Sequence, residues 1–108
     1  MTEPKPEYNI KESDVQHACV ELLEACSWEV IITSQDRATR RHVQGLTDLI
    51  AWRDNVTLFI ECKRPGGKLR HSQKRFRDRI LPHTGPNLHY LVVDDVDSLA
   101  YALSLLGL

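Results

Sequence analysis

The sequence predicts one α/β domain with the element order αβββαβα. Apolar residues repeat at helical spacing near the N-terminus, and three strand-like runs follow them. A charged stretch of helical spacing then leads to a further apolar run and a final amphipathic segment. The chain has 108 residues, of which 42% are hydrophobic, so it is long enough for one hydrophobic core and too short for two domains.

The first helix is predicted from about residue 9 to residue 26. Its apolar positions fall at three- and four-residue steps, and they are Val15, Ala18, Cys19, Leu22, Leu23 and Cys26. Two capping boxes compete for its start. One joins Asn9 to Glu12. The other joins Ser13 to Gln16.

The three strands that follow are predicted from β-branched, aromatic and other apolar residues. Residues 28–33 form the first, and a polar loop over residues 34–45 follows it. The second and third, over residues 46–52 and 56–63, are joined at Asp54-Asn55. Asx residues tolerate the left-handed conformation that a two-residue hairpin turn requires, so these two strands are expected to be antiparallel neighbours.

The last three elements are a helix, a strand and a helix. Residues 72–81 mix charged and apolar side chains at helical spacing and stop before Pro82. Residues 87–94 form a buried strand, and Asp95 is placed to cap the final helix. The apolar side of that helix consists of Val96, Leu99, Ala100, Leu103 and Leu106.

Composition excludes several classes of protein. No apolar run approaches the roughly 18 residues of a membrane span, and the N-terminus lacks the apolar core of a signal peptide. Residues 1–8, with two prolines and mixed charge, predict a flexible tail before one domain over residues 9–108. The three cysteines are too few and too scattered for a disulfide scaffold, which favours the cytoplasm. These cysteines and the two tryptophans are expected in the core.

The formal net charge of −1 hides an uneven distribution. Residues 36–80 hold twelve cations and five anions, a sum of +7, whereas the rest of the chain sums to −8. A cationic stretch is often only a solvated surface, but such asymmetry also indicates a face that binds a polyanion.

The predicted hairpin places two carboxylates opposite each other. With a two-residue turn at Asp54-Asn55, Asp48 faces Glu61 with Cβ atoms about 5 Å apart. Lys63 shares the face of Glu61, because side chains alternate along a strand. Two carboxylates at that distance repel, and a hard divalent cation with oxygen ligands resolves the repulsion. The pattern predicts a metal site beside a lysine that holds a water molecule or neutralises charge on a phosphate.

Each of these residues also has an ordinary explanation. Asp48 can simply begin a strand after a glycine turn, and Glu-x-Lys triplets occur by chance at exposed strand ends. However, the apolar neighbours of Glu61 predict that its strand lies inside the sheet. A carboxylate and a lysine are unfavourable there unless they are paired or bind a ligand, so the joint pattern favours a site.

The segments that carry this pattern resemble a known nuclease family. They are Gly45-Leu46-Thr47-Asp48-Leu49-Ile50, Phe59-Ile60-Glu61-Cys62-Lys63, Pro65-Gly66-Gly67-Lys68-Leu69 and Gln73-Lys74. They look like the VRR-NUC branch of the PD-(D/E)xK nuclease superfamily, over roughly residues 9–105. The resemblance implies a restriction-endonuclease-like αβββαβ core with a C-terminal helix, and a mixed sheet flanked by helices.

The resemblance also implies a role for each residue of the site. Asp48 and Glu61 would be ligands of Mg²⁺ or Mn²⁺, together with the backbone carbonyl of Cys62. Lys63 would orient the attacking water and stabilise the transition state. Gln73 would steady the site from the helix that follows.

Three further positions bear on this assignment. Thr47 stands where the family usually has proline, and Arg70-His71 stands where it often has Ser-Pro, which removes a good N-cap before Gln73. The family also has an acidic residue on its first helix. At 100° per residue, Glu12 points toward the apolar stripe of that helix and Glu21 points away from it. Glu12 is therefore the expected additional catalytic residue, although it can equally serve only as a capping-box partner.

Basic residues flank the predicted site on both sides. Those expected to contact DNA are Arg37, Arg40, Arg41, Lys68, Arg70, Lys74 and Arg77. Arginine grips phosphate oxygens in pairs, and phosphate contacts carry no base information. They favour recognition of DNA shape.

The sequence is therefore interpreted as a Mg²⁺- or Mn²⁺-dependent endodeoxyribonuclease with no nucleotide cofactor and no membrane partner. Small members of the family resemble Holliday junction resolvases of bacterial or phage-infected cells, which implies branched DNA and a homodimer, because a four-way junction is two-fold symmetric. The alternatives are a flap or nicking nuclease of repair or phage DNA processing, and a non-catalytic nucleic-acid-binding module.

Overall fold

A computed structural model describes residues 9–35, except the side chain of Gln35, and residues 43–108. The expected tail over residues 1–8 lies outside the described residues. The elements are α1 (Glu12–Ala25), β1 (Glu29–Ile32), the 3₁₀ turn η2 (Thr33–Gln35), β2 (Leu49–Arg53), β3 (Val56–Cys62), α3 (His71–Ile80), the 3₁₀ turn η3 (Leu81–His83), β4 (Leu88–Val93) and α4 (Val96–Leu105).

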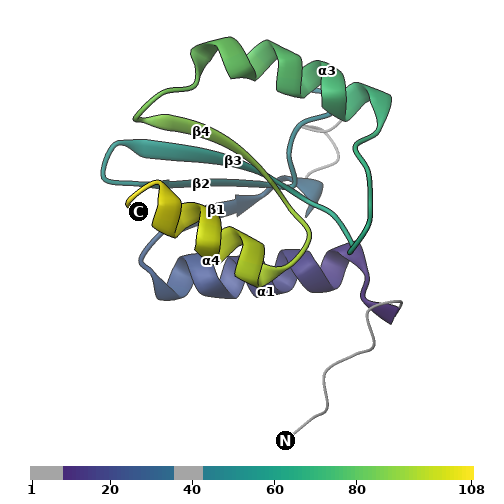
Figure 1. Ribbon diagram of the computed structural model, residues 1–108, viewed down its shortest axis with the longest axis horizontal. Coiled ribbons are helices and arrows are strands. Elements are labelled where there is room, and N and C mark those ends of the chain that lie inside the picture. The colour runs from purple at the N-terminus through teal and green to yellow at the C-terminus, as the bar shows by residue number, and fades with distance from the viewer. Residues whose placement is uncertain (1–8, 36–42) are drawn as a thin grey trace, which may run out of the picture.

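The strands form one mixed sheet in the order β1-β2-β3-β4. The β1–β2 and β2–β3 pairs are antiparallel, and β3 pairs with β4 in parallel. A parallel pair requires a crossover connection, and α3 supplies it. Helices α1 and α4 cover one face of the sheet, and α3 lies over the other (Figure 1). The predicted α/β class, with a mixed sheet between helices, is confirmed.

The hairpin of β2 and β3 has the predicted register. Asp54 and Asn55 have φ values of 50° and 69°, which are the left-handed values that a two-residue turn of this kind requires. Leu49 pairs with Ile60 and Arg53 pairs with Val56. Asp48, the residue before β2, therefore lies at the end of β3 that carries Glu61.

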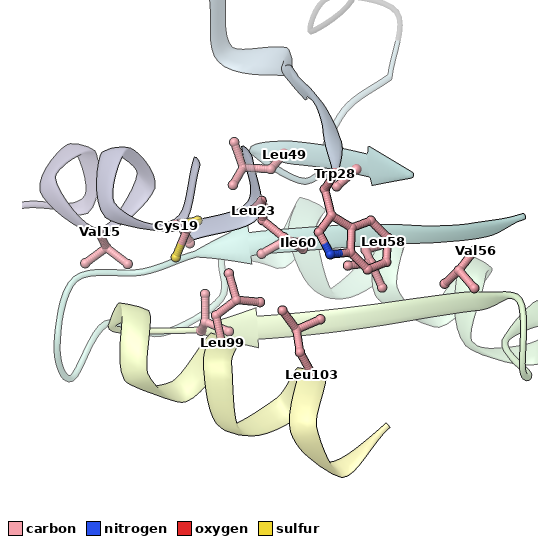
Figure 2. Close-up of a cluster of buried hydrophobic side chains, with 13 residues drawn as sticks. Val15, Cys19, Leu23, Trp28, Leu49, Val56, Leu58, Ile60, Leu99 and Leu103 are labelled. Carbon is pink, nitrogen blue, oxygen red and sulfur yellow. The ribbon is translucent and has the colours of Figure 1, made fainter. Parts of the chain in front are cut away.

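The hydrophobic core lies between the sheet and the two helices α1 and α4. Figure 2 shows Val15, Cys19 and Leu23 of α1 facing Leu99 and Leu103 of α4, with Leu58 and Ile60 of β3 between them. Alternation along the strands directs the neighbouring side chains to the face under α3, where Phe59 packs against Phe76 with ring centroids 5.9 Å apart.

Several details differ from the sequence-based expectations. Helix α1 begins after Lys11, whose N–H donates to Oδ2 of Asp14 at 2.9 Å, so neither of the two expected capping boxes starts it. Cys26 ends the helix and is exposed. Trp52 is 42% exposed, because it lies on the sheet face that α3 covers only in part. The expected cap of α4 is confirmed, since Asp95 accepts a hydrogen bond from Ser98 N–H.

In the part of the chain that the structure describes, no helix has both the length and the apolar character needed to span a bilayer.

Candidate active site

Four polar side chains are buried together where β3 ends beneath the start of α3. Asp48 precedes β2, Glu61 lies in β3, Lys63 follows β3, and Gln73 lies in the first turn of α3. Their exposed fractions are 5% for Asp48, 1% for Glu61, 5% for Lys63 and 3% for Gln73. Burying so many polar and ionisable groups is unfavourable unless each is hydrogen-bonded or paired, so their contacts define what the site can do.

Gln73 connects the lysine to the buried glutamate. Its Nε2 donates to Oε1 of Glu61 at 2.8 Å. Its Oε1 accepts from Nζ of Lys63 and from the backbone N–H of Arg70, each at 2.8 Å. Both partners of Oε1 are donors only, which fixes the orientation of the amide. Gln73 thus holds Lys63 and Glu61 in place and completes the N-terminal turn of α3.

Lys63 lies between two carboxylates. Its Nζ is 3.5 Å from Oε1 of Glu61 and 3.4 Å from Oε1 of Glu12. Glu12 is the first residue of α1, and its side chain is 41% exposed. Glu12 is therefore the acidic residue of the first helix that reaches the site, as its direction on that helix predicted.

Asp48 and Glu61 form the acidic part of the site. Oδ2 of Asp48 accepts the backbone N–H of Cys62 at 3.0 Å, which ties the residue before β2 to the end of β3. Burial raises the pKa of Glu61 to about 8, and the nearby carboxylate of Asp48 adds to the rise. The positive charge of Lys63 acts in the opposite direction and offsets part of this rise in the pKa of Glu61. The second carboxylate oxygen of Glu61, Oε2, is buried without a hydrogen-bond partner among the described residues.

These features fit a hard divalent cation. Mg²⁺ and Mn²⁺ prefer oxygen ligands, and the site offers two neighbouring buried carboxylates, one with an unpartnered oxygen. Across residues 9–35 and 43–108, no group of three or more His, Cys, Asp or Glu side chains is arranged to hold a metal. A cation here would depend on two carboxylates, a backbone carbonyl and water, and Mg²⁺ commonly keeps several waters and uses one or two carboxylates.

A glycine fixes the distance between the loop before Asp48 and helix α3. Gly45 has a φ of 77°, and a Cβ placed on it would overlap the backbone carbonyl of Ser72. The loop therefore packs directly on the backbone of the first turn of α3, the turn that carries Gln73. This contact explains the glycine at the start of the Asp48 segment.

A second tight turn follows Lys63. The N–H of Gly67 donates to the carbonyl of Arg64 at 2.8 Å, and Gly66 has a φ of 77°. Proline at the second position and glycine at the third are typical of a type II turn. The turn brings the chain back past Lys63, so that Lys68 and Arg70 line the same pocket as Glu12.

The structure sorts the predicted DNA contacts into three groups. Lys68 and Arg70 lie beside the site. On α3, Lys74 is exposed, and Nε of Arg77 is 3.1 Å from Oδ1 of Asp78. The remaining three, Arg37, Arg40 and Arg41, lie outside the described residues.

Sequence reasoning missed two participants. The first is the backbone N–H of Cys62, which donates to the carboxylate of Asp48. The hairpin register predicted that these two segments meet, but it did not predict which backbone group bonds the carboxylate. Arg64 lines the pocket beside Lys63. The sequence shows that Arg64 follows Lys63 and precedes Pro-Gly-Gly, but only the geometry of the turn shows that Arg64 lines the pocket.

The comparison with protein families agrees with the resemblance. A family model, the VRR-NUC domain, matches residues 3–94 of the chain, a range that contains every residue of the site. No curated protein matches the chain.

Proposed function

The chain belongs to the VRR-NUC domain family of nucleases, and on that premise we propose that it is a Mg²⁺- or Mn²⁺-dependent endonuclease that hydrolyses phosphodiester bonds of branched DNA. The observation that carries the proposal is the buried cluster of two carboxylates, a lysine and a glutamine, in which one oxygen of Glu61 has no partner among the described residues.

The proposed metal ligands are Asp48, Glu61 and the backbone carbonyl of Cys62. A cation at this position would act as a Lewis acid on the phosphate and would make water a better nucleophile at neutral pH. The residues of the chain supply the framework for this chemistry. The Cys62 N–H holds the carboxylate of Asp48, and Gln73 holds that of Glu61.

Lys63 is the proposed catalytic cation. Its Nζ is buried, and two carboxylates and the amide oxygen of Gln73 surround it. A fixed positive charge stabilises the negative charge that develops on a phosphate during in-line attack by water, without reorganising at the moment of reaction. Glu12 and Gln73 act on the reaction through Lys63, which they position.

The proposed substrate is DNA, recognised by shape. Lys68, Arg70, Lys74 and Arg77 lie on the segment that follows Lys63, and cations there make phosphate contacts that carry no sequence information. Resolution of a four-way junction requires two cuts related by two-fold symmetry, so this proposal includes a homodimer.

A cleavage assay tests the proposal. End-labelled four-way junction, flap, nicked duplex and single-stranded DNA are incubated with the protein in Mg²⁺, in Mn²⁺ and in EDTA. We expect metal-dependent internal cuts, fastest on the junction. We expect Lys63→Ala to be slower by at least about 100-fold and Arg75→Gln, an exposed change on α3, to match the wild type.

The outcomes separate the candidates. Faster cutting of flaps or nicked duplex would replace the junction by a repair or DNA-processing substrate. Binding of DNA without cleavage under any condition would indicate a non-catalytic module. A Lys63→Ala protein as active as the wild type would overturn the assignment of cleavage to this site. A monomer at micromolar concentration in analytical ultracentrifugation, with and without junction DNA, would overturn the resolvase assignment.

A further inference from the structure

The pocket beside Lys63 adjoins the carboxylate cluster and shares Lys63 with it. It has a volume of about 240 Å³, and it is lined by Glu12, Lys63, Arg64, Gly67, Lys68 and Arg70. Four of these six residues are cations. The single acid, Glu12, already lies 3.4 Å from Lys63.

The other three cations have no acidic partner in the part of the chain that the structure describes. Within residues 9–35 and 43–108, no carboxylate forms an ion pair with Arg64, Lys68 or Arg70. By contrast, Arg53 and Arg77 each pair with one carboxylate and Lys63 with two. Like charges that converge without a counter-charge repel one another. An anion bound in this pocket would relieve the repulsion among the three.

The backbone enforces this convergence. The turn closed by Gly67 N–H and the Arg64 carbonyl reverses the chain between the first and second cation. A Cβ on Gly67 would lie 3.0 Å from that carbonyl and 3.3 Å from Cβ of Lys63, so the turn packs against the segment that carries Lys63. The third cation, Arg70, is fixed at the N-cap of α3 because its N–H donates to Gln73.

The position of Arg70 adds a second attraction for anions. Helix α3 has ten residues and begins directly after Arg70, so the positive end of its dipole lies beside the pocket. Anions are stabilised at such an end. The pocket therefore combines a helix N-terminus with three cations that pair with no carboxylate of the described residues, next to the buried lysine of the site.

We infer that this pocket is a second phosphate subsite, which holds the phosphate adjacent to the one being cleaved on the same DNA strand. The inference rests on the proposed function. Lys63 lines the pocket and also belongs to the carboxylate cluster, so a strand whose scissile phosphate meets Lys63 presents its neighbouring phosphate to Arg64, Lys68 and Arg70. The enzyme then requires charge at that neighbour, and a terminal bond with no phosphate beyond it is a poor substrate.

The test combines DNA substrates in which one phosphate is neutral with protein variants in which one side chain of the pocket is neutral. Substrates carry a single uncharged methylphosphonate at each linkage in turn around the mapped cut. With the wild type we expect one linkage next to the cut to lower cleavage about 10- to 100-fold, as expected for hydrogen bonds to a charged group. With Arg70→Gln or Lys68→Gln, cleavage of unmodified DNA is slower, and neutralising the same linkage has little further effect.

A matched control removes a charge outside the pocket. Arg75 is exposed on α3 and does not line this cavity, so Arg75→Gln should keep the full sensitivity to the neutral linkage. The inference is overturned if the two pocket variants are as sensitive as the wild type, or if the wild type tolerates a neutral phosphate on both sides of the cut. Lys68 and Arg70 are exposed, so loss of folding does not confuse the result.

A binding measurement separates this inference from the proposed function. Metal-free protein is titrated with inorganic pyrophosphate while the backbone amide resonances are followed. Shifts confined to residues 64–71 that disappear in Arg70→Gln support the subsite even if no DNA is cleaved. Absence of shifts in that segment, with an enzyme that does cleave DNA, would refute the subsite and leave the nuclease assignment intact.

Discussion

The buried carboxyl of Glu61 makes a strong prediction about stability in the absence of metal. Burial, together with the charge of Asp48, raises its pKa from the ordinary value of 4.5 to about 8. A raised carboxyl pKa means that the folded protein holds the proton more tightly than the unfolded chain. Ionisation of Glu61 therefore opposes folding.

The direction with pH follows from linkage. Below about pH 4.5 the group is protonated in both states, and it imposes no penalty. As the pH rises from 4.5 to 8, the unfolded chain releases its proton first, so the folded state loses stability. Above pH 8 the penalty is complete. One pKa unit corresponds to 1.36 kcal/mol, so between pH 5 and pH 9 the loss is about 4 kcal/mol. That is a large part of the roughly 5–15 kcal/mol typical of a domain.

The wild type is compared with Glu61→Gln. Glutamine has the shape of glutamate and keeps an oxygen that accepts from Gln73, but it cannot ionise. Free energies of unfolding are measured by urea denaturation in EDTA at several pH values for both proteins. We expect the variant to gain about 4 kcal/mol on the wild type between pH 5 and pH 9, because all other titrating groups are shared. Added Mg²⁺ should increase the free energy of unfolding at pH 9 more for the wild type than for the variant. Parallel pH profiles in EDTA would refute the burial argument for Glu61.

Three further outcomes are expected. Gly45→Ala should lose about 2–5 kcal/mol, from the left-handed φ and from overlap with α3. Gly66→Ala has the same φ and open space, so it should lose only about 1–2 kcal/mol; equal losses in urea denaturation would contradict the proposed packing. Asn55→Ala should lose about 1 kcal/mol, and Asn55→Gly should stay within about 0.5 kcal/mol of the wild type, because Asn55 has a φ of 69°. A thiol reagent should label Cys26 quickly in the native protein and the two buried cysteines only after unfolding; three equal rates would show that the core is open.

The hairpin shows what local sequence determines. Asp54-Asn55 supports only a few turn geometries, and a two-residue turn fixes the register of every pair behind it. For this reason the meeting of Asp48 with the end of β3 was predictable from residue numbers alone. The alternation that puts Lys63 on the side of Glu61 follows from strand geometry in the same way.

The start of α3 shows where local sequence is insufficient. Arg70 has no side-chain oxygen to cap a helix, so its segment lacks the usual preference for Ser, Thr, Asp or Asn. The helix begins there because Gln73 reaches back to the Arg70 N–H while it also bonds Lys63 and Glu61. Those two partners come from another part of the chain, and no local pattern reveals them.

Burial of side chains was predictable only where an element has one covered face. The stripe of α1 placed Cys19 correctly, but Cys26 at its end points to solvent. Trp52 is apolar enough for a core, yet its strand position directs it to the face beneath α3. That face extends beyond a ten-residue helix, and the extent of coverage is a tertiary property.

Helix α3 differs from α1 and α4 in what holds it to the sheet. Its one buried residue is Gln73, whereas the other two helices bury only apolar side chains. Segments with little buried apolar surface open at lower free energy than the global unfolding. The amides of α3 should therefore exchange with solvent as a separate unit, ahead of the core strands. Each such opening takes Gln73 away from Lys63 and Glu61, so the fraction of time that the site is assembled equals the fraction of time that this helix is docked.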